Sequence, residues 1–208
     1  MNEILNGILV GMPEGIENLQ LPNPDLRDYY RDEEDRIFWL NDTVEDCAED
    51  LIKMILRCNK EDKGIPAEDR KPIKIFIDSP GGDVTFMWSI INLIKLSKTK
   101  VITINYCIAY SAAAEILASG HERLGFPGSH VMIHNGSCTY SGQADVVEST
   151  KKYFDKLTKK TVDNLIERTG IDAKSLKRKG SKDWYLDENE AIENGIIDKI
   201  VTDLDEVL

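Results

Sequence analysis

The chain has 208 residues, of which 41% are hydrophobic and 30% are charged, the ordinary balance of a globular protein with a core. Its formal net charge of −11 argues against nucleic acid or an anionic membrane surface as a partner, because both bind cationic surfaces. The sequence has no apolar run long enough for a membrane span, and its first residues lack the basic segment of a signal peptide. Widely separated cysteines favour free thiols in a cytoplasmic protein over disulfides or a metal site: Cys47, Cys58, Cys107 and Cys138.

Strand and helix patterns alternate along the chain. An apolar run at 36–41 predicts a strand, and apolar residues at three- and four-residue steps predict a helix over 42–59. The polar stretch 60–72 predicts a surface loop. The later predicted elements are a strand at 73–78, a helix from 84 to 94, a strand at 100–108, a helix at 109–120, a strand at 130–134, a helix at 144–168, and a helix–strand pair at 189–201.

This alternation predicts the fold class and the domain organisation. Strands that alternate with helices indicate an α/β fold with a mainly parallel sheet. Residues 1–30 contain three of the seven prolines and are expected to form an extended N-terminal arm. One domain is expected over 31–208.

Two strand–helix junctions contain unusual residues, and such junctions are where ligands bind in α/β sheets. In Ser79-Pro80-Gly81-Gly82, adjacent glycines let the backbone approach a ligand, although such a sequence is more often only a turn. In "IAYSAAAEI", Ser111 lies at the first turn of a helix, where free N–H groups suit an oxyanion. Ser111 is either a nucleophile or simply the cap of that helix.

A serine nucleophile needs a base, and the chain has three histidines. His121 and His130 lie in a polar, loop-like segment and are expected to be solvated. His134 ends the apolar strand at 130–134, so its side chain would emerge at the end of the sheet. It is either a structural residue or the general base for Ser111.

Five segments occur in the order and approximate spacing typical of the Clp protease proteolytic subunit (ClpP) family: "FIDSPGGDVT", "IAYSAAAEILASG", "HVMIH", "SGQADV" and "LDENEAIENGIIDKIV". Over residues 36–201 the chain resembles a divergent member of this family, with Cys107 and Ala112 where the family usually has glycine and methionine. The resemblance implies a crotonase-like α/β fold of repeated strand–strand–helix units with a protruding handle helix. It also implies a serine endopeptidase that cleaves peptides or unfolded polypeptides.

The same resemblance assigns catalytic roles. Ser111 matches the nucleophile, His134 the base, and Asp183 the acid, which in the family lies a fixed distance past a Thr-Gly pair. Other aspartates compete for the third role: Asp172, Asp187 and Asp198. The backbone N–H groups of Gly82 and Ala112 match the donors of the oxyanion hole.

The resemblance further implies a homo-oligomer of stacked rings, heptameric in the family, with the active sites inside a chamber. Because the chain has no G-x-x-x-x-G-K-[ST] motif, unfolding of substrates would need a separate AAA+ ATPase. No metal or other cofactor is expected. Two alternatives remain open: a catalytically silent ring subunit or scaffold, and a crotonase-type enzyme that acts on a CoA thioester.

Overall fold

The computed structural model describes residues 27–208. Helix α2 (Arg27–Asp35) belongs to one unit, and the remainder, Arg36–Leu208, forms a second compact unit that contains every predicted site residue. Most of the predicted N-terminal arm lies outside the described residues. Its last four residues, 27–30, begin α2 and are helical rather than extended.

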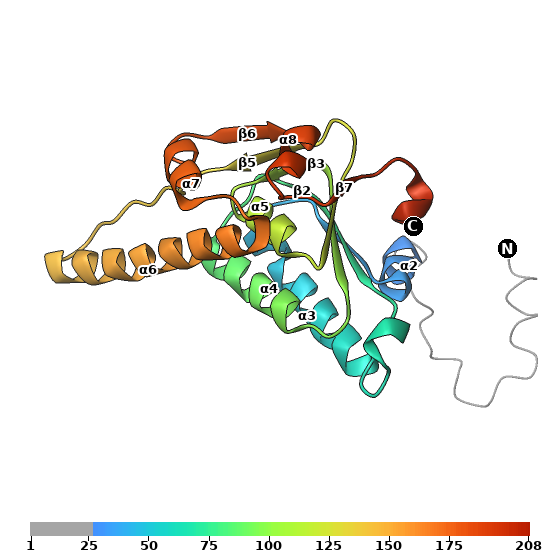
Figure 1. Cartoon of the computed structure of the whole chain (residues 1–208). Coiled ribbons are helices and arrows are strands. Elements are labelled where there is room, and N and C mark those ends of the chain that lie inside the picture. The colour runs from blue at the N-terminus through green and yellow to red at the C-terminus, as the bar shows by residue number, and fades with distance from the viewer. Residues whose placement is uncertain (1–26) are drawn as a thin grey trace, which may run out of the picture. The chain divides into compact units, whose positions relative to one another are not determined.

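A sheet of seven strands forms the centre of the second unit (Figure 1). Its main path runs β1-β2-β3-β4-β7, and β5 pairs with both β3 and β6. Every pairing is parallel except that of β5 with β6. The strands are β1 (Ile37–Leu40), β2 (Ile73–Ser79), β3 (Val101–Tyr110), β4 (Glu122–Gly125), β5 (His130–Ile133), β6 (Trp184–Asp187) and β7 (Lys199–Ile200).

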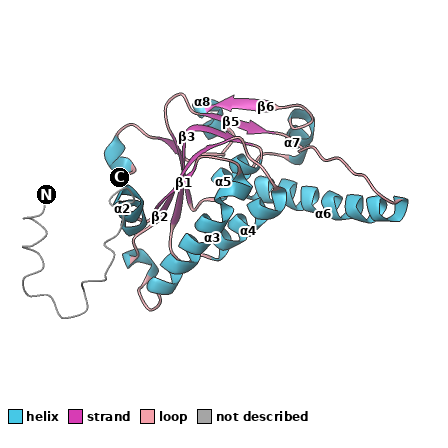
Figure 2. Ribbon diagram, turned by 180° about the vertical axis from the view of Figure 1, so that it is seen from behind, coloured by secondary structure: helices cyan, strands magenta, loops and turns pink. Residues whose placement is uncertain are grey.

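The helices pack mainly against one face of the sheet. Helix α3 contacts α4, α4 contacts α5, and α5 contacts α6, as the view from behind shows (Figure 2). The helices are α3 (Val44–Glu61), α4 (Val84–Leu96), α5 (Ala112–Ser119), α6 (Ala144–Thr169), α7 (Ala173–Lys179) and α8 (Glu188–Glu193), with short 3₁₀ turns η3 (Ala67–Asp69) and η4 (Leu204–Glu206).

Successive side chains of β2 point to opposite faces of the sheet, as a two-residue period requires. Ile73, Ile75 and Ile77 of β2 are fully buried in the large core beneath the helices. Phe76 belongs instead to a smaller cluster on the opposite face, with Ile104 and the C-terminal Val207. The two faces of the sheet are therefore covered unequally.

Helix α6 extends beyond the body of the unit (Figure 1). Its two buried residues, Asn164 and Leu165, lie near its C-terminal end. In the protruding half, Val146 and Tyr153 are more than half exposed. The predicted helix at 144–168 is thus confirmed within one residue, but much of its apolar surface has no cover within one chain.

Among the α-helices and strands of Arg36–Leu208, three were not predicted from the sequence: β4, α7 and β6. The four-residue strands β4 and β6 are too short to show a reliable period, and each is stabilised by pairing with strands distant in sequence. Helix α7 buries only Leu176 among lysines and arginines, so its periodicity is weak. The helix predicted at 109–120 is shorter than expected, because β3 continues through Tyr110.

Candidate active site

Ser111 lies in the sharp turn between β3 and α5, with φ +54° and ψ −120°. Within residues 27–208, Arg36 is the other non-glycine residue with positive φ, a conformation that costs about 1–3 kcal/mol and collects at functional sites. The Ser111 N–H donates to the Met132 carbonyl at 2.8 Å, which holds the turn against β5. Ser111 is the N-cap residue of α5 by position, but its hydroxyl makes no capping hydrogen bond to the helix, so capping does not account for the side chain.

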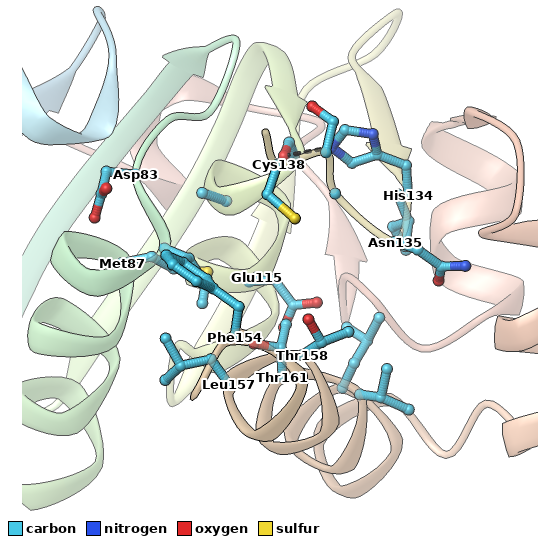
Figure 3. A pocket seen from close by; sticks show the side chains of 18 of the residues that line it. Asp83, Met87, Glu115, His134, Asn135, Cys138, Phe154, Leu157, Thr158 and Thr161 are labelled. Atoms are coloured by element: carbon cyan, nitrogen blue, oxygen red, sulfur yellow. Dashed lines mark hydrogen bonds between the residues drawn. The ribbon is translucent and has the colours of Figure 1, made fainter. Parts of the chain in front are cut away.

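The Ser111 hydroxyl instead faces His134: Oγ lies 2.7 Å from Nε2 (Figure 3). Strand pairing explains this contact. Strands β3 and β5 are parallel, with Tyr110 opposite Met132, so the residues that follow each strand emerge at the same end of the sheet. The other histidines do not approach Ser111; His130 is exposed at the start of β5, and His121 Nδ1 accepts the Val101 N–H at 2.9 Å.

Asp183 lies beside the other nitrogen of the same ring, with its Oδ1 3.4 Å from His134 Nδ1. The register of the antiparallel pair β5–β6 accounts for this position. Ile133 lies opposite Trp184, so continuation by one residue sets His134 opposite Asp183. The His134 side chain is 25% exposed and that of Asp183 is 54% exposed, so the pair lies at the surface of a single chain.

The three competing aspartates have other roles. Asp172 accepts the N–H groups of Lys174 and Ser175 at the start of α7, and Asp187 forms a capping box with Glu190 in α8. Asp198 forms an ion pair with Arg123. Among these four carboxylates, Asp183 is the one that pairs with His134.

The backbone around Gly82 is held by residues that the sequence analysis did not identify. Glu45 Oε2 accepts the Asp83 N–H at 2.7 Å, and Val44 N–H donates to the Gly81 carbonyl at 2.9 Å. A Cβ on Gly82, whose φ is +150°, would lie 2.0 Å from Glu45 Oε2. Neither glycine therefore tolerates a side chain, because a Cβ on Gly81 would lie 2.8 Å from Ser111 Cβ.

Ala112 is the first residue of α5, so its N–H has no acceptor within the helix. The N–H of Gly82 likewise donates to no protein acceptor among the described hydrogen bonds. Both residues line the same cavity as Ser111 and His134. Two free donors near a nucleophile are the elements of an oxyanion site.

A cavity of about 410 Å³ adjoins Ser111 and is lined by residues of α4, α5, α6, α7 and the segment after β5 (Figure 3). Its walls are largely apolar, and they include Met87, Ile133, Phe154, Leu157, Leu165 and Leu176. Glu115 also lines this cavity. It was visible in the sequence as the one charged residue of the helix "AAAEILAS", four residues after Ser111, but its significance was missed.

Among residues 27–208, no group of three or more histidine, cysteine, aspartate or glutamate side chains could hold a metal ion. No helix in this part of the chain is long and apolar enough to cross a membrane. All four cysteines are free thiols.

The fold and the site together define a crotonase-like α/β protein in which a serine, a histidine and a carboxylate lie in line. The chain belongs to the Clp protease family, whose model matches residues 27–203. It is similar to the ATP-dependent Clp protease proteolytic subunit 2 of Treponema denticola, with 38% identity over 132 residues, which cover 62% of this chain and 66% of that protein. The match thus spans just under two thirds of that relative. The predicted family and fold class are confirmed.

Proposed function

We propose that the protein is a serine endopeptidase that cleaves peptides or unfolded polypeptides with a Ser111–His134–Asp183 triad. The observation that carries the proposal is the Oγ–Nε2 distance of 2.7 Å, with the Asp183 carboxylate beside the opposite ring nitrogen. Membership of the Clp protease family supports the same chemistry. A silent scaffold or a CoA thioester enzyme would not require this alignment of three side chains.

In the proposed reaction, Ser111 Oγ attacks the scissile carbonyl while His134 Nε2 takes its proton. The imidazolium then donates that proton to the amine as the C–N bond breaks, leaving an acyl group on Ser111. Water, deprotonated by His134, attacks the acyl group and regenerates the serine. Asp183 accepts the Nδ1–H of His134, which keeps Nε2 free to act as the base.

The oxyanion of each tetrahedral intermediate would be bound by the N–H groups of Gly82 and Ala112. These donors belong to a fixed loop and to a helix N-terminus, so little reorganisation is needed when charge develops. Loss of one such donor typically costs about 10²–10³-fold in turnover.

The proposed working form is a homo-oligomer of stacked rings in the cytoplasm, fed with unfolded protein by a separate AAA+ ATPase. Apolar side chains exposed on the protruding half of α6 support contacts between subunits. The relative from Treponema denticola is by name a subunit of an ATP-dependent protease. Free thiols support a reducing compartment.

The test is labelling with a fluorophosphonate, which reacts with activated serines, followed by peptide mapping. Ser111 should carry the label, and Ser111→Ala should lose both label and peptide hydrolysis, the latter by about 10⁴–10⁶-fold. Ser137→Ala is the matched control, because Ser137 lines the same cavity and is exposed. A label on Ser137, or unlabelled wild-type protein, would refute the proposal.

A further inference from the structure

Glu115 is a buried carboxyl group for which the proposed triad has no use. Only 8% of the residue is exposed, and its Oε2 atom has no hydrogen-bond partner within the described chain. Burial raises its pKa to about 8, against a smaller opposing effect of a hydrogen bond from Asn164. An unpaired buried acid is costly, so such groups commonly mark a binding partner that is absent.

The position of Glu115 relates it directly to the reacting centre. Glu115 lies in the first turn of α5, directly after the Ser111 turn, and lines the same cavity as Ser111 and His134. Figure 3 shows the carboxyl group inside the cavity, near Thr158 and Thr161 of α6. A substrate residue whose carbonyl carbon is attacked by Ser111 would have this cavity, with Glu115 in its wall, available for its side chain.

The rest of the cavity favours a long cationic side chain. Apolar walls that include Met87, Phe154 and Leu157 suit a chain of methylene groups. The threonine hydroxyls offer acceptors beside the carboxyl group. Asp83 is the other carboxylate at this cavity, and no lysine or arginine lines it. A lysine or arginine side chain would therefore find apolar walls and an unpaired acid in the same cavity.

We propose that Glu115 selects substrates with lysine or arginine on the amino side of the scissile bond. This inference rests on the proposed peptidase function and adds a substrate class to it. The ammonium or guanidinium group pairs with Glu115 and satisfies its unpaired oxygen, and any proton on the carboxyl group is released to solvent on binding. Aliphatic side chains fill the same walls but leave the buried acid without a partner, so they bind less well.

The experiment compares kcat/KM for peptides that differ only at this position: lysine, arginine, and the uncharged counterparts norleucine and citrulline. Wild-type protein should cleave each cationic peptide at least about tenfold faster than its neutral counterpart. Glu115→Gln, which keeps the shape and removes the charge, should abolish that ratio while norleucine turnover persists. Glu193→Gln is the control, because Glu193 is exposed on α8 and the same chemical change there should leave the ratio intact.

Fluorophosphonate labelling of Ser111, measured in parallel, separates this inference from the proposed function. Unlabelled protein that cleaves no peptide refutes both. Labelled protein that cleaves norleucine peptides as fast as lysine peptides refutes the role of Glu115 alone. If Glu115→Gln misfolds and therefore fails to label, the substrate preference of the wild-type protein tests the inference: a preference for cationic peptides supports it, and no preference overturns it. A preference that persists in labelled Glu115→Gln assigns selectivity to another residue and overturns the inference.

Discussion

At the scale of single residues, the site depends on backbone conformations that most side chains cannot adopt. Ser111 has positive φ, and Gly81 and Gly82 approach their neighbours too closely for a Cβ. The nucleophile and one of the two proposed donors, Gly82, therefore occupy strained or crowded positions. This arrangement makes substitutions there informative, because each changes a contact that the structure defines.

We expect Gly82→Ala to lower peptide turnover by about 10²-fold or more, the cost of losing an oxyanion donor. The new methyl group would meet the backbone nitrogen of Val44 at 2.9 Å as well as Glu45 Oε2, so the loop that carries the Gly82 N–H should shift. Steady-state kinetics and fluorophosphonate labelling measure the effect. Gly128→Ala is the control, since its φ is also positive but nothing lies within 4 Å of the new Cβ. Full activity of Gly82→Ala would remove Gly82 from the oxyanion site.

We expect Asp183→Asn to reduce kcat almost as much as His134→Ala, because an amide favours the wrong imidazole tautomer. In the serine protease that serves as the general example of a triad, the same change costs about 10⁴-fold, a value used here only for scale. The double variant should be no worse than His134→Ala, since triad members act as a unit. Asp187→Asn should keep its activity, because asparagine also caps a helix. Retention of more than about a tenth of wild-type kcat in Asp183→Asn would exclude the triad as drawn.

At the scale of elements, an ion pair links the start of β1 to the end of α3. Arg36 donates to both oxygens of Asp62 at 2.7 and 2.8 Å, and Thr99 Oγ1 donates to Asp62 Oδ2 at 2.6 Å. The hydrogen bond from Arg36 is the main reason that the pKa of Asp62 lies below its ordinary value, and burial opposes it. The charged form is thus stabilised in the folded state.

This lowered pKa predicts how stability depends on pH. A carboxyl group with a lowered folded pKa contributes its full stability above its unfolded pKa, about 3.9, and loses it as the pH falls through the lower folded value. Urea unfolding should therefore show a free energy of unfolding that declines below about pH 4. Asp62→Asn should be less stable at pH 7 by about 2 kcal/mol and show a shallower decline. If the free energy of unfolding of Asp62→Asn fell with decreasing pH as steeply as that of the wild-type protein, the decline would be due to other carboxylates.

At the scale of the whole molecule, one chain leaves apolar surface uncovered where α6 protrudes. Val146 is 53% exposed and Tyr153 is 52% exposed, and they lie seven residues apart on one side of the helix. Surface of this kind commonly marks a protein–protein interface. The three side chains of the proposed triad, by contrast, come together within one chain.

Sedimentation velocity at micromolar concentration should therefore find a large homo-oligomer. Val146→Asp with Tyr153→Asp should shift the protein to smaller species, because charges would then lie in the proposed contact between subunits. Lys159→Asp is the control on the opposite side of the same helix, where the chain is also exposed. A wild-type monomer with full peptidase activity would contradict the compartment proposal.

The sequence alone was sufficient for the α/β class, for most strands and helices, and for Ser111, His134 and Asp183 as candidates. Periodicity reports which face of a segment is buried, and the family motifs are local in sequence, so both can be read from one chain. Tertiary structure was needed to separate Asp183 from Asp172, Asp187 and Asp198. That choice depends on the register of β5 against β6, and β6 is too short to be predicted.

The role of Glu45 and the burial of Glu115 also depended on tertiary structure. Glu45 accepts the N–H of Asp83, 38 positions away, and Glu115 is an unpaired acid in a core where α6 packs against α5. The residue types that do chemistry are visible in a sequence because each has its own side-chain chemistry. Pairing and packing between segments far apart in the chain decide which of these residues lie within reach of one another. They also decide which residues are buried away from solvent.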